Sequence, residues 1–132
     1  MLALVSSPLP YLSRSYLFRI SPVIYGGDCR RGGAPAQREL ALRLEYRPNP
    51  IDSYQQIYAI SWWTSLPWLH RVTMPTLVFS GARDPLVPVQ NAYLLARQIP
   101  NARLELIADG GHLWMLEHPE ASAALVDEFL SG

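Results

Sequence analysis

The 132-residue sequence contains no lysine. All eleven of its basic residues are arginines, and eleven aspartates and glutamates balance their charge. Apart from the adjacent Arg30 and Arg31, the arginines are scattered singly. This pattern excludes a basic patch for nucleic acid and a polybasic stretch for a membrane surface. Only 17% of the residues are charged and 49% are hydrophobic, which predicts one folded domain with a sizeable core rather than a disordered chain.

Cysteine is nearly absent as well, since Cys29 is the only one. A single cysteine excludes an internal disulfide framework and fits a reducing compartment, so we expect a structural cysteine and a cytoplasmic protein. The sequence also has few long apolar runs: residues 1–5 are apolar but lack a basic leader and soon meet Pro8 and Pro10. We therefore expect neither a signal peptide nor a transmembrane helix.

Two short segments near the C-terminus carry the clearest structural signal. Residues 76–80 are strand formers that end at a glycine, and residues 103–107 are a second such run. Helices are predicted between and after them, over residues 88–98 and 120–130. This order predicts two parallel strands joined by a right-handed crossover, with the first strand buried on both faces.

The first part of the chain predicts mainly helices and loops. Residues 34–47 contain good helix formers, and a second helix is predicted to begin at Asp52, whose carboxylate can cap it. The glycine-rich residues 25–33 predict a loop. Residues 2–5 fit either a strand or the tail of a helix, because periodicity cannot separate the two in so short a run.

Each predicted strand is followed, just beyond glycine, by a side chain suited to chemistry: Asp84 after the first strand and His112 after the second. The carboxyl ends of neighbouring parallel strands lie at the same edge of a sheet, where sites in α/β proteins gather. A histidine activates a hydroxyl nucleophile when a buried carboxylate holds it in the correct tautomer. Asp84 and His112 are therefore the candidate acid and base.

Simpler interpretations compete with this one. Asp84 can be a turn residue whose carboxylate accepts nearby backbone N–H groups. Asp109 is an alternative acid, although its place in the loop before His112 favours a bracing role. His118 fits a surface or capping position, and neither His118 nor His70 has a metal-ligand spacing to His112, so no metal site is predicted.

The order of acid and then base matches the last two members of the triad of α/β-hydrolases. The pattern strand-Gly-x-x-Asp-x-x-x-Pro in residues 75–88, and Gly-His followed by Glu-His-Pro in residues 111–119, resemble the C-terminal part of that fold. The resemblance implies a partial α/β-hydrolase fold, with a helical lid over residues 1–72 and the C-terminal βαβα part of the core over residues 73–132. The Gly-x-Ser-x-Gly turn that carries the family's nucleophile occurs nowhere in the sequence, so the chain alone is expected to be inactive.

A narrower resemblance extends upstream. Ser-Pro-x-x-Tyr at residues 7–11, Ile-Tyr-Gly-Gly at residues 24–27 and the Trp-rich residues 63–71 are similar to the lid of intracellular medium-chain-length poly(3-hydroxyalkanoate) depolymerases. Gly-Gly-His stands where Asp-Gly-His is expected in those enzymes. The resemblance implies a hydrophobic ester or polyester substrate, no cofactor, and a substrate-binding role for three lid tryptophans: Trp62, Trp63 and Trp68.

Aromatic clusters of this kind are more often core or domain contacts than pocket walls. Two functions therefore stand side by side. The first is a fragment of a serine-type carboxylic-ester hydrolase that supplies the acid and base. The second is a catalytically inactive remnant or binding module that uses an apolar aromatic face. In either case two strands leave an unpaired sheet edge, which predicts self-association.

Overall fold

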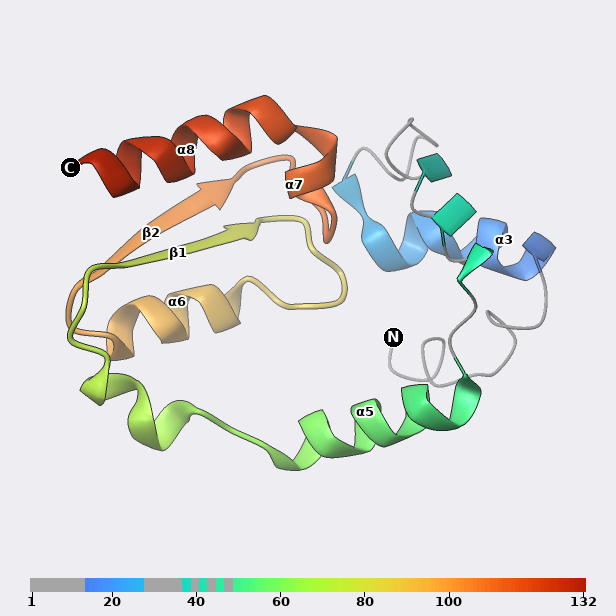
Figure 1. Ribbon diagram of the computed structural model, residues 1–132, viewed down its shortest axis with the longest axis horizontal. Coiled ribbons are helices and arrows are strands. Elements are labelled where there is room, and N and C mark those ends of the chain that lie inside the picture. The colour runs from blue at the N-terminus through green and yellow to red at the C-terminus, as the bar shows by residue number, and fades with distance from the viewer. Residues whose placement is uncertain (1–13, 28–36, 39–40, 43–44, 47–48) are drawn as a thin grey trace.

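The computed structural model describes residues 14–27, 37–38, 41–42, 45–46 and 49–132. These residues include a parallel sheet of two strands, in which β1 (Thr76–Gly81) pairs with β2 (Ala102–Ile107). Thr76 is opposite Ala102 at one end of the ladder and Gly81 is opposite Ile107 at the other. Both predicted strands and their parallel direction are confirmed. The two strands therefore end at the same edge of the sheet (Figure 1).

Helices cover both faces of this sheet. α6 (Gln90–Gln98) joins the strands and packs on one face, and α8 (Pro119–Ser131) lies on the other (Figure 1). Pro119 is in the first turn of α8, where its missing N–H costs no hydrogen bond. The face against α6 holds the compact core, formed by four buried residues: Leu69, Val78, Ala92 and Ile99. The predicted α/β class and the helices after each strand are confirmed.

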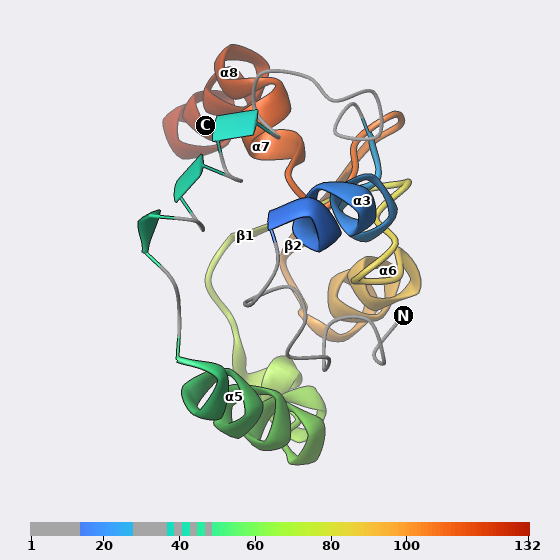
Figure 2. The same ribbon diagram turned by 90° about the vertical axis from the view of Figure 1, so that its right-hand side faces the viewer.

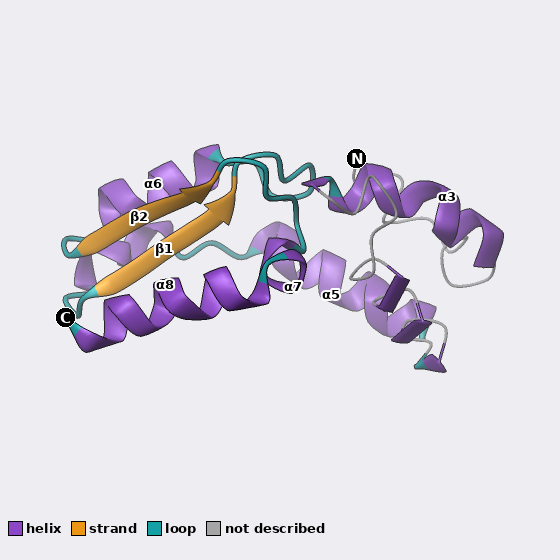
Figure 3. Ribbon diagram, turned by 90° about the horizontal axis from the view of Figure 1, so that it is seen from above, coloured by secondary structure: helices purple, strands orange, loops and turns teal. Residues whose placement is uncertain are grey.

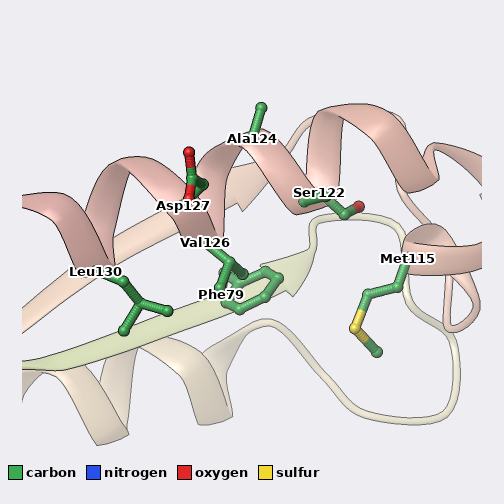
Figure 4. Close-up of a pocket in the computed structure, with 8 residues that line it drawn as sticks. Phe79, Met115, Ser122, Ala124, Val126, Asp127 and Leu130 are labelled. Atoms are coloured by element: carbon green, nitrogen blue, oxygen red, sulfur yellow. The ribbon is translucent and has the colours of Figure 1, made fainter.

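The face beneath α8 is less filled. Phe79 of β1 packs against Trp114 of the short helix α7 (Trp114–Glu117), with ring centroids 4.5 Å apart, but no residue of α8 is buried. Figure 4 shows the hollow between β1 and α8, about 640 Å³ in volume, with Phe79 at its floor below Val126. The prediction that β1 is buried on both faces is wrong, because this layer is loosely filled and only Val78 and Gly81 of the strand are buried.

Helices precede the sheet. They are α3 (Arg14–Tyr25), α5 (Pro50–Trp62) and the 3-10 helix η2 (Leu66–Arg71). α3 was not predicted, since prolines punctuate its region and one of them, Pro22, lies inside the helix. Figures 1 and 3 show α3 beyond the carboxyl ends of the strands, whereas Figure 2 shows α5 on the far side of the structure from α7.

The start of α5 differs from the prediction. The helix begins at Pro50 rather than Asp52, and Asn49 is its N-cap, with Oδ1 accepting a hydrogen bond from the N–H of Ile51 at 3.0 Å. Proline suits the first helical position because its fixed φ is already helical. Asp52 instead places a negative charge in the first turn, where it complements the helix dipole.

Some predictions fall on residues outside the described ranges. These include residues 2–5, Cys29 and most of the predicted loop over 25–33. Of the predicted helix over 34–47, the structure describes a minority of residues, and those at 37–38, 41–42 and 45 are helical. None of the helices in the described ranges is both long enough and apolar enough to cross a membrane.

Candidate active site

Asp84 lies in the turn that follows β1. The turn is tied to the end of β2 by two backbone hydrogen bonds, from Ala82 N to Ile107 O and from Arg83 N to Gly110 O, each 2.9 Å. The carboxylate of Asp84 is nearly buried, with 7% of the side chain exposed. Its Oδ1 accepts the N–H groups of Leu86 at 2.8 Å and Val87 at 3.0 Å. One oxygen therefore fixes the turn and leaves Oδ2 to face another group.

That group is His112. Its Nδ1 lies 2.9 Å from Oδ2 of Asp84, at hydrogen-bonding distance, and its side chain is 35% exposed. A neutral imidazole that donates Nδ1–H to the carboxylate keeps a lone pair on Nε2, which is the atom able to take a proton. The structure thus joins the two residues that the sequence singled out, and the turn interpretation of Asp84 holds at the same time through its other oxygen.

The His112 loop is packed too tightly for side chains at its glycines. A Cβ on Gly81 would meet the backbone of Gly110 at 2.5 Å, and a Cβ on Gly111 would lie 2.6 Å from the backbone of both Gly26 and Gly27. Glycine is required at these positions because the backbone segments approach one another directly. The loop is therefore held between the end of β1 and the end of α3.

Tyr25, the last residue of α3, is the part of the site that sequence reasoning missed. Its carbonyl accepts the backbone N–H of His112 at 2.6 Å, and its ring stacks with the imidazole at a centroid distance of 6.4 Å and an interplanar angle of 14°. The available signal was the Gly26-Gly27 pair, whose φ angles of 63° and 50° end the helix. The sequence predicts a loop there and resembles a lid, but it does not indicate a helix end beside His112.

The other polar candidates lie outside the pair. Asp109 forms an exposed ion pair with Arg83 at 3.0 Å, which supports the bracing role predicted for it rather than the role of acid. His70 is exposed on η2, and His118 is exposed at the N-cap of α8, where its side chain makes no capping hydrogen bond. Within the described residues no group of His, Cys, Asp and Glu side chains is arranged to hold a metal ion.

The three tryptophans are not brought to the pair. Trp62, Trp63 and Trp68 are 79%, 71% and 56% exposed and belong to α5, the segment after it, and η2. Trp68 carries the guanidinium of Arg71 over its ring at 5.4 Å. In the part of the chain that the structure describes, these exposed side chains make α5, the segment after it and η2 an open aromatic surface.

A network of ion pairs lies toward the other end of the sheet from the site. On β2, Arg103 bonds Glu105 and Glu128 at 2.8 Å each, and these two hydrogen bonds raise the pKa of Arg103. The three side chains lie on the surface, so the network is screened by salt.

The described residues bring no hydroxyl partner to the pair. No Gly-x-Ser-x-Gly occurs in the sequence, and among the described residues no hydroxyl forms a hydrogen bond with His112. The arrangement supplies a base oriented by a carboxylate, which is able to activate a hydroxyl brought to Nε2.

Comparisons with known proteins identify the family of the chain. Residues 26–119 match the family model described as alpha/beta hydrolase fold. The chain is 41% identical over 130 residues to a poly(3-hydroxyalkanoate) depolymerase of Ectopseudomonas oleovorans, covering 96% of this chain and 44% of the relative. It is 34% identical over 108 residues to a pimeloyl-[acyl-carrier protein] methyl ester esterase of Aromatoleum aromaticum, covering 80% of this chain and 42% of that protein.

Solved structures give the same result. A serine hydrolase involved in carbazole degradation superposes with a TM-score of 0.74 at 25% identity, covering 90% of this chain and 47% of that one. The non-heme bromoperoxidase BpoC of Mycobacterium tuberculosis superposes with a TM-score of 0.72 at 25% identity, covering 91% of this chain and 46% of that one. The chain spans less than half the length of these relatives. By sequence and by fold, it belongs to the alpha/beta hydrolase fold family.

Proposed function

We propose that this chain supplies the acid and the base of a serine-type carboxylic-ester hydrolase, with Asp84 as the orienting acid and His112 as the general base. The hydrogen bond of 2.9 Å between Nδ1 of His112 and Oδ2 of Asp84 is the observation that carries the proposal. The substrate is a hydrophobic ester, and the depolymerase relative points to a polyester as the first class to test. No cofactor is needed for this chemistry.

The proposed reaction follows from the two side chains. Nε2 of His112 removes the proton of a serine hydroxyl as the oxygen attacks the ester carbonyl, and the carboxylate of Asp84 stabilises the imidazolium that forms. The imidazolium then protonates the departing alkoxide, which leaves an acyl-enzyme. Water, deprotonated by the same Nε2, cleaves the acyl-enzyme and restores the serine, so the balance is ester plus water giving acid plus alcohol.

The serine must come from outside these 132 residues, since the sequence contains no nucleophile turn. The outer edge of β1 supports a place for further strands, because no other strand of the described ranges pairs with it and it lies beside the apolar hollow under α8 (Figure 4). An unpaired edge also favours pairing between copies of the chain. Size-exclusion chromatography tests this: we expect an oligomer, and a well-behaved monomer argues against an open edge.

Residues 1–72 are proposed as the lid and residues 73–132 as part of the catalytic core. The exposure of Trp62, Trp63 and Trp68 supports a surface that an acyl chain or a polyester contacts, since exposed apolar patches mark binding sites. The lone cysteine supports a reducing, cytoplasmic location.

A second candidate function is a catalytically inactive remnant or binding module. The open aromatic surface on α5 and η2 favours it, because that surface suits a partner as well as a substrate. Translation of the genomic sequence upstream of Met1 in the same frame separates the two candidates. A Gly-x-Ser-x-Gly turn there favours the hydrolase, and an unrelated upstream region favours the remnant.

The direct experiment is a chimera. The part of the Ectopseudomonas depolymerase that precedes its matched region is fused to the N-terminus of this chain, and hydrolysis of a medium-chain p-nitrophenyl ester is followed. We expect turnover well above that of a matched chimera in which the donor's nucleophilic serine is alanine. A folded chimera no faster than that control contradicts the proposed function.

A further inference from the structure

Three segments, from two distant parts of the sequence, meet beside His112. They are the turn at the end of α3, the loop that follows β2, and α7. A Cβ built on Gly27 would lie 2.5 Å from the backbone nitrogen of Gly111, so the turn and the loop are in direct backbone contact. The same turn carries Tyr25, which holds His112 through its carbonyl and its ring.

Glu117, the last residue of α7, closes this junction from the other side. A Cβ on Gly27 would lie 2.7 Å from Oε2 and 3.0 Å from Oε1 of Glu117, so both carboxylate oxygens lie close to the turn. Oε2 is removed from solvent. Glu117 as a whole is half-buried, and the desolvation of Oε2 costs free energy that its place in the fold must offset.

We propose that Glu117 is a positioning residue for His112. Its carboxylate holds the Gly26-Gly27 turn against the Gly111 loop, and the turn in turn fixes the imidazole through the 2.6 Å hydrogen bond from His112 N to Tyr25 O. Glu117 does not touch the reacting atoms. The predicted effect of Glu117 on catalysis rests on the proposed function. The predicted effect of Glu117 on the Asp84–His112 hydrogen bond does not, because that hydrogen bond is present in the chain whether or not the chain is part of an enzyme.

The first test uses the full 132-residue chain and NMR of its histidine rings. The measured quantity is the rate at which the Nδ1–H proton of His112 exchanges with water. Glu117→Ala removes the carboxylate, so we expect exchange at least about tenfold faster, the signature of a loosened local structure. Glu120→Ala, an exposed glutamate in the first turn of α8, is the matched control and should leave the rate unchanged.

Two further variants keep the test decisive if Glu117→Ala does not fold. Glu117→Gln keeps the length and one acceptor oxygen, so it should retain most of the protection, whereas Glu117→Asp keeps the charge but withdraws both oxygens from the turn and should lose it. Equal exchange rates in the wild type and in Glu117→Asp overturn the proposal. So does a Gln variant that exchanges as fast as the Asp variant.

The chimera supplies the catalytic readout. Misplacement of a catalytic group by about 1 Å costs up to about 100-fold in rate, so Glu117→Asp should lower kcat by about 10- to 100-fold with little change in KM. A fall confined to KM contradicts a positioning role. An inactive wild-type chimera contradicts the proposed function, while the exchange measurement in the 132-residue chain still decides the role of Glu117.

Discussion

The packing of the His112 loop against α3 makes Gly111→Ala the sharpest stability test. Gly111 has no positive φ, unlike Gly26 and Gly27, so the substitution introduces no backbone strain of its own. Its effect is steric: the new methyl group would lie 2.6 Å from Gly26 C and 2.6 Å from Gly27 N, and closer still to the carbonyl oxygen of Tyr25. All three are backbone atoms, which cannot rotate away.

The magnitude follows from those contacts. Carbon atoms in contact are ordinarily about 3.5–4.0 Å apart, so the loop and the turn must separate by about 1 Å. Overpacking of this kind costs about 1–3 kcal/mol, and weakening the bond from His112 N to Tyr25 O costs about 1 kcal/mol more. Alanine restores about 0.4–1 kcal/mol by restricting the unfolded chain, which leaves a net loss of about 1–3 kcal/mol.

Urea unfolding followed by circular dichroism measures this loss. With a dependence of about 1–3 kcal/mol per molar urea, the midpoint should fall by about 1 M. Gly132→Ala is the matched control, because the nearest atom to its added methyl group is 3.7 Å away and its stability should change by less than about 0.5 kcal/mol. If the two variants unfold at the same midpoint, the close approach of the loop to α3 is refuted.

Three other perturbations test separate parts of the structure. In the chimera, Asp84→Asn should lower kcat by about 10⁴-fold. The amide carbonyl keeps the turn hydrogen bonds, so the amide NH2 group faces Nδ1 of His112 and selects the wrong tautomer of the imidazole. Steady-state kinetics measure kcat, and a variant that stays active refutes the role of Asp84 as the acid. Trp114→Ala deletes a buried ring in contact with the sheet and should lower the free energy of unfolding in urea by about 3–5 kcal/mol. Trp62→Ala, at an exposed position, should change it by less than about 0.5 kcal/mol. Similar losses in the two variants contradict the packing of Trp114 against Phe79. Because the pKa of Arg103 is raised, the contribution of Arg103 to stability is complete below its ordinary pKa and is lost only at higher pH. The difference in urea midpoint between the wild type and Arg103→Gln should therefore stay constant across neutral pH and shrink as salt is added. A difference that changes steeply across neutral pH is the contrary result.

Local patterns were enough to predict the two residues that meet. Asp84 and His112 each follow a short run of strand formers and glycine, and parallel pairing brings the ends of such strands together whatever lies elsewhere in the chain. The register that places Gly81 opposite Ile107 also ties the two turns to each other. The candidate pair was therefore predictable from these two strands alone.

Contacts between segments distant in the sequence were not predictable. The stacking of Tyr25 on His112 and the approach of Glu117 to Gly27 depend on where α3 lies, and a proline-interrupted helix gives a weak periodic signal. The sequence identifies Phe79 only as a strand residue, and its contact with the ring of Trp114 is visible only in the structure. For Trp62 the sequence indicates an apolar aromatic cluster, but it does not predict whether other residues cover that cluster, and the structure leaves Trp62 exposed.

The hydrogen bond between Asp84 and His112 is central to the account, and ester turnover by the chimera with His112→Ala tests it most directly. Loss of the base should lower kcat by about 10⁴-fold or more relative to the unmodified chimera. His70→Ala, which removes an exposed histidine on η2, should keep the rate within about twofold, as expected for a surface substitution away from the site. A His112→Ala chimera that is folded and retains its turnover would contradict the role of this residue as the base.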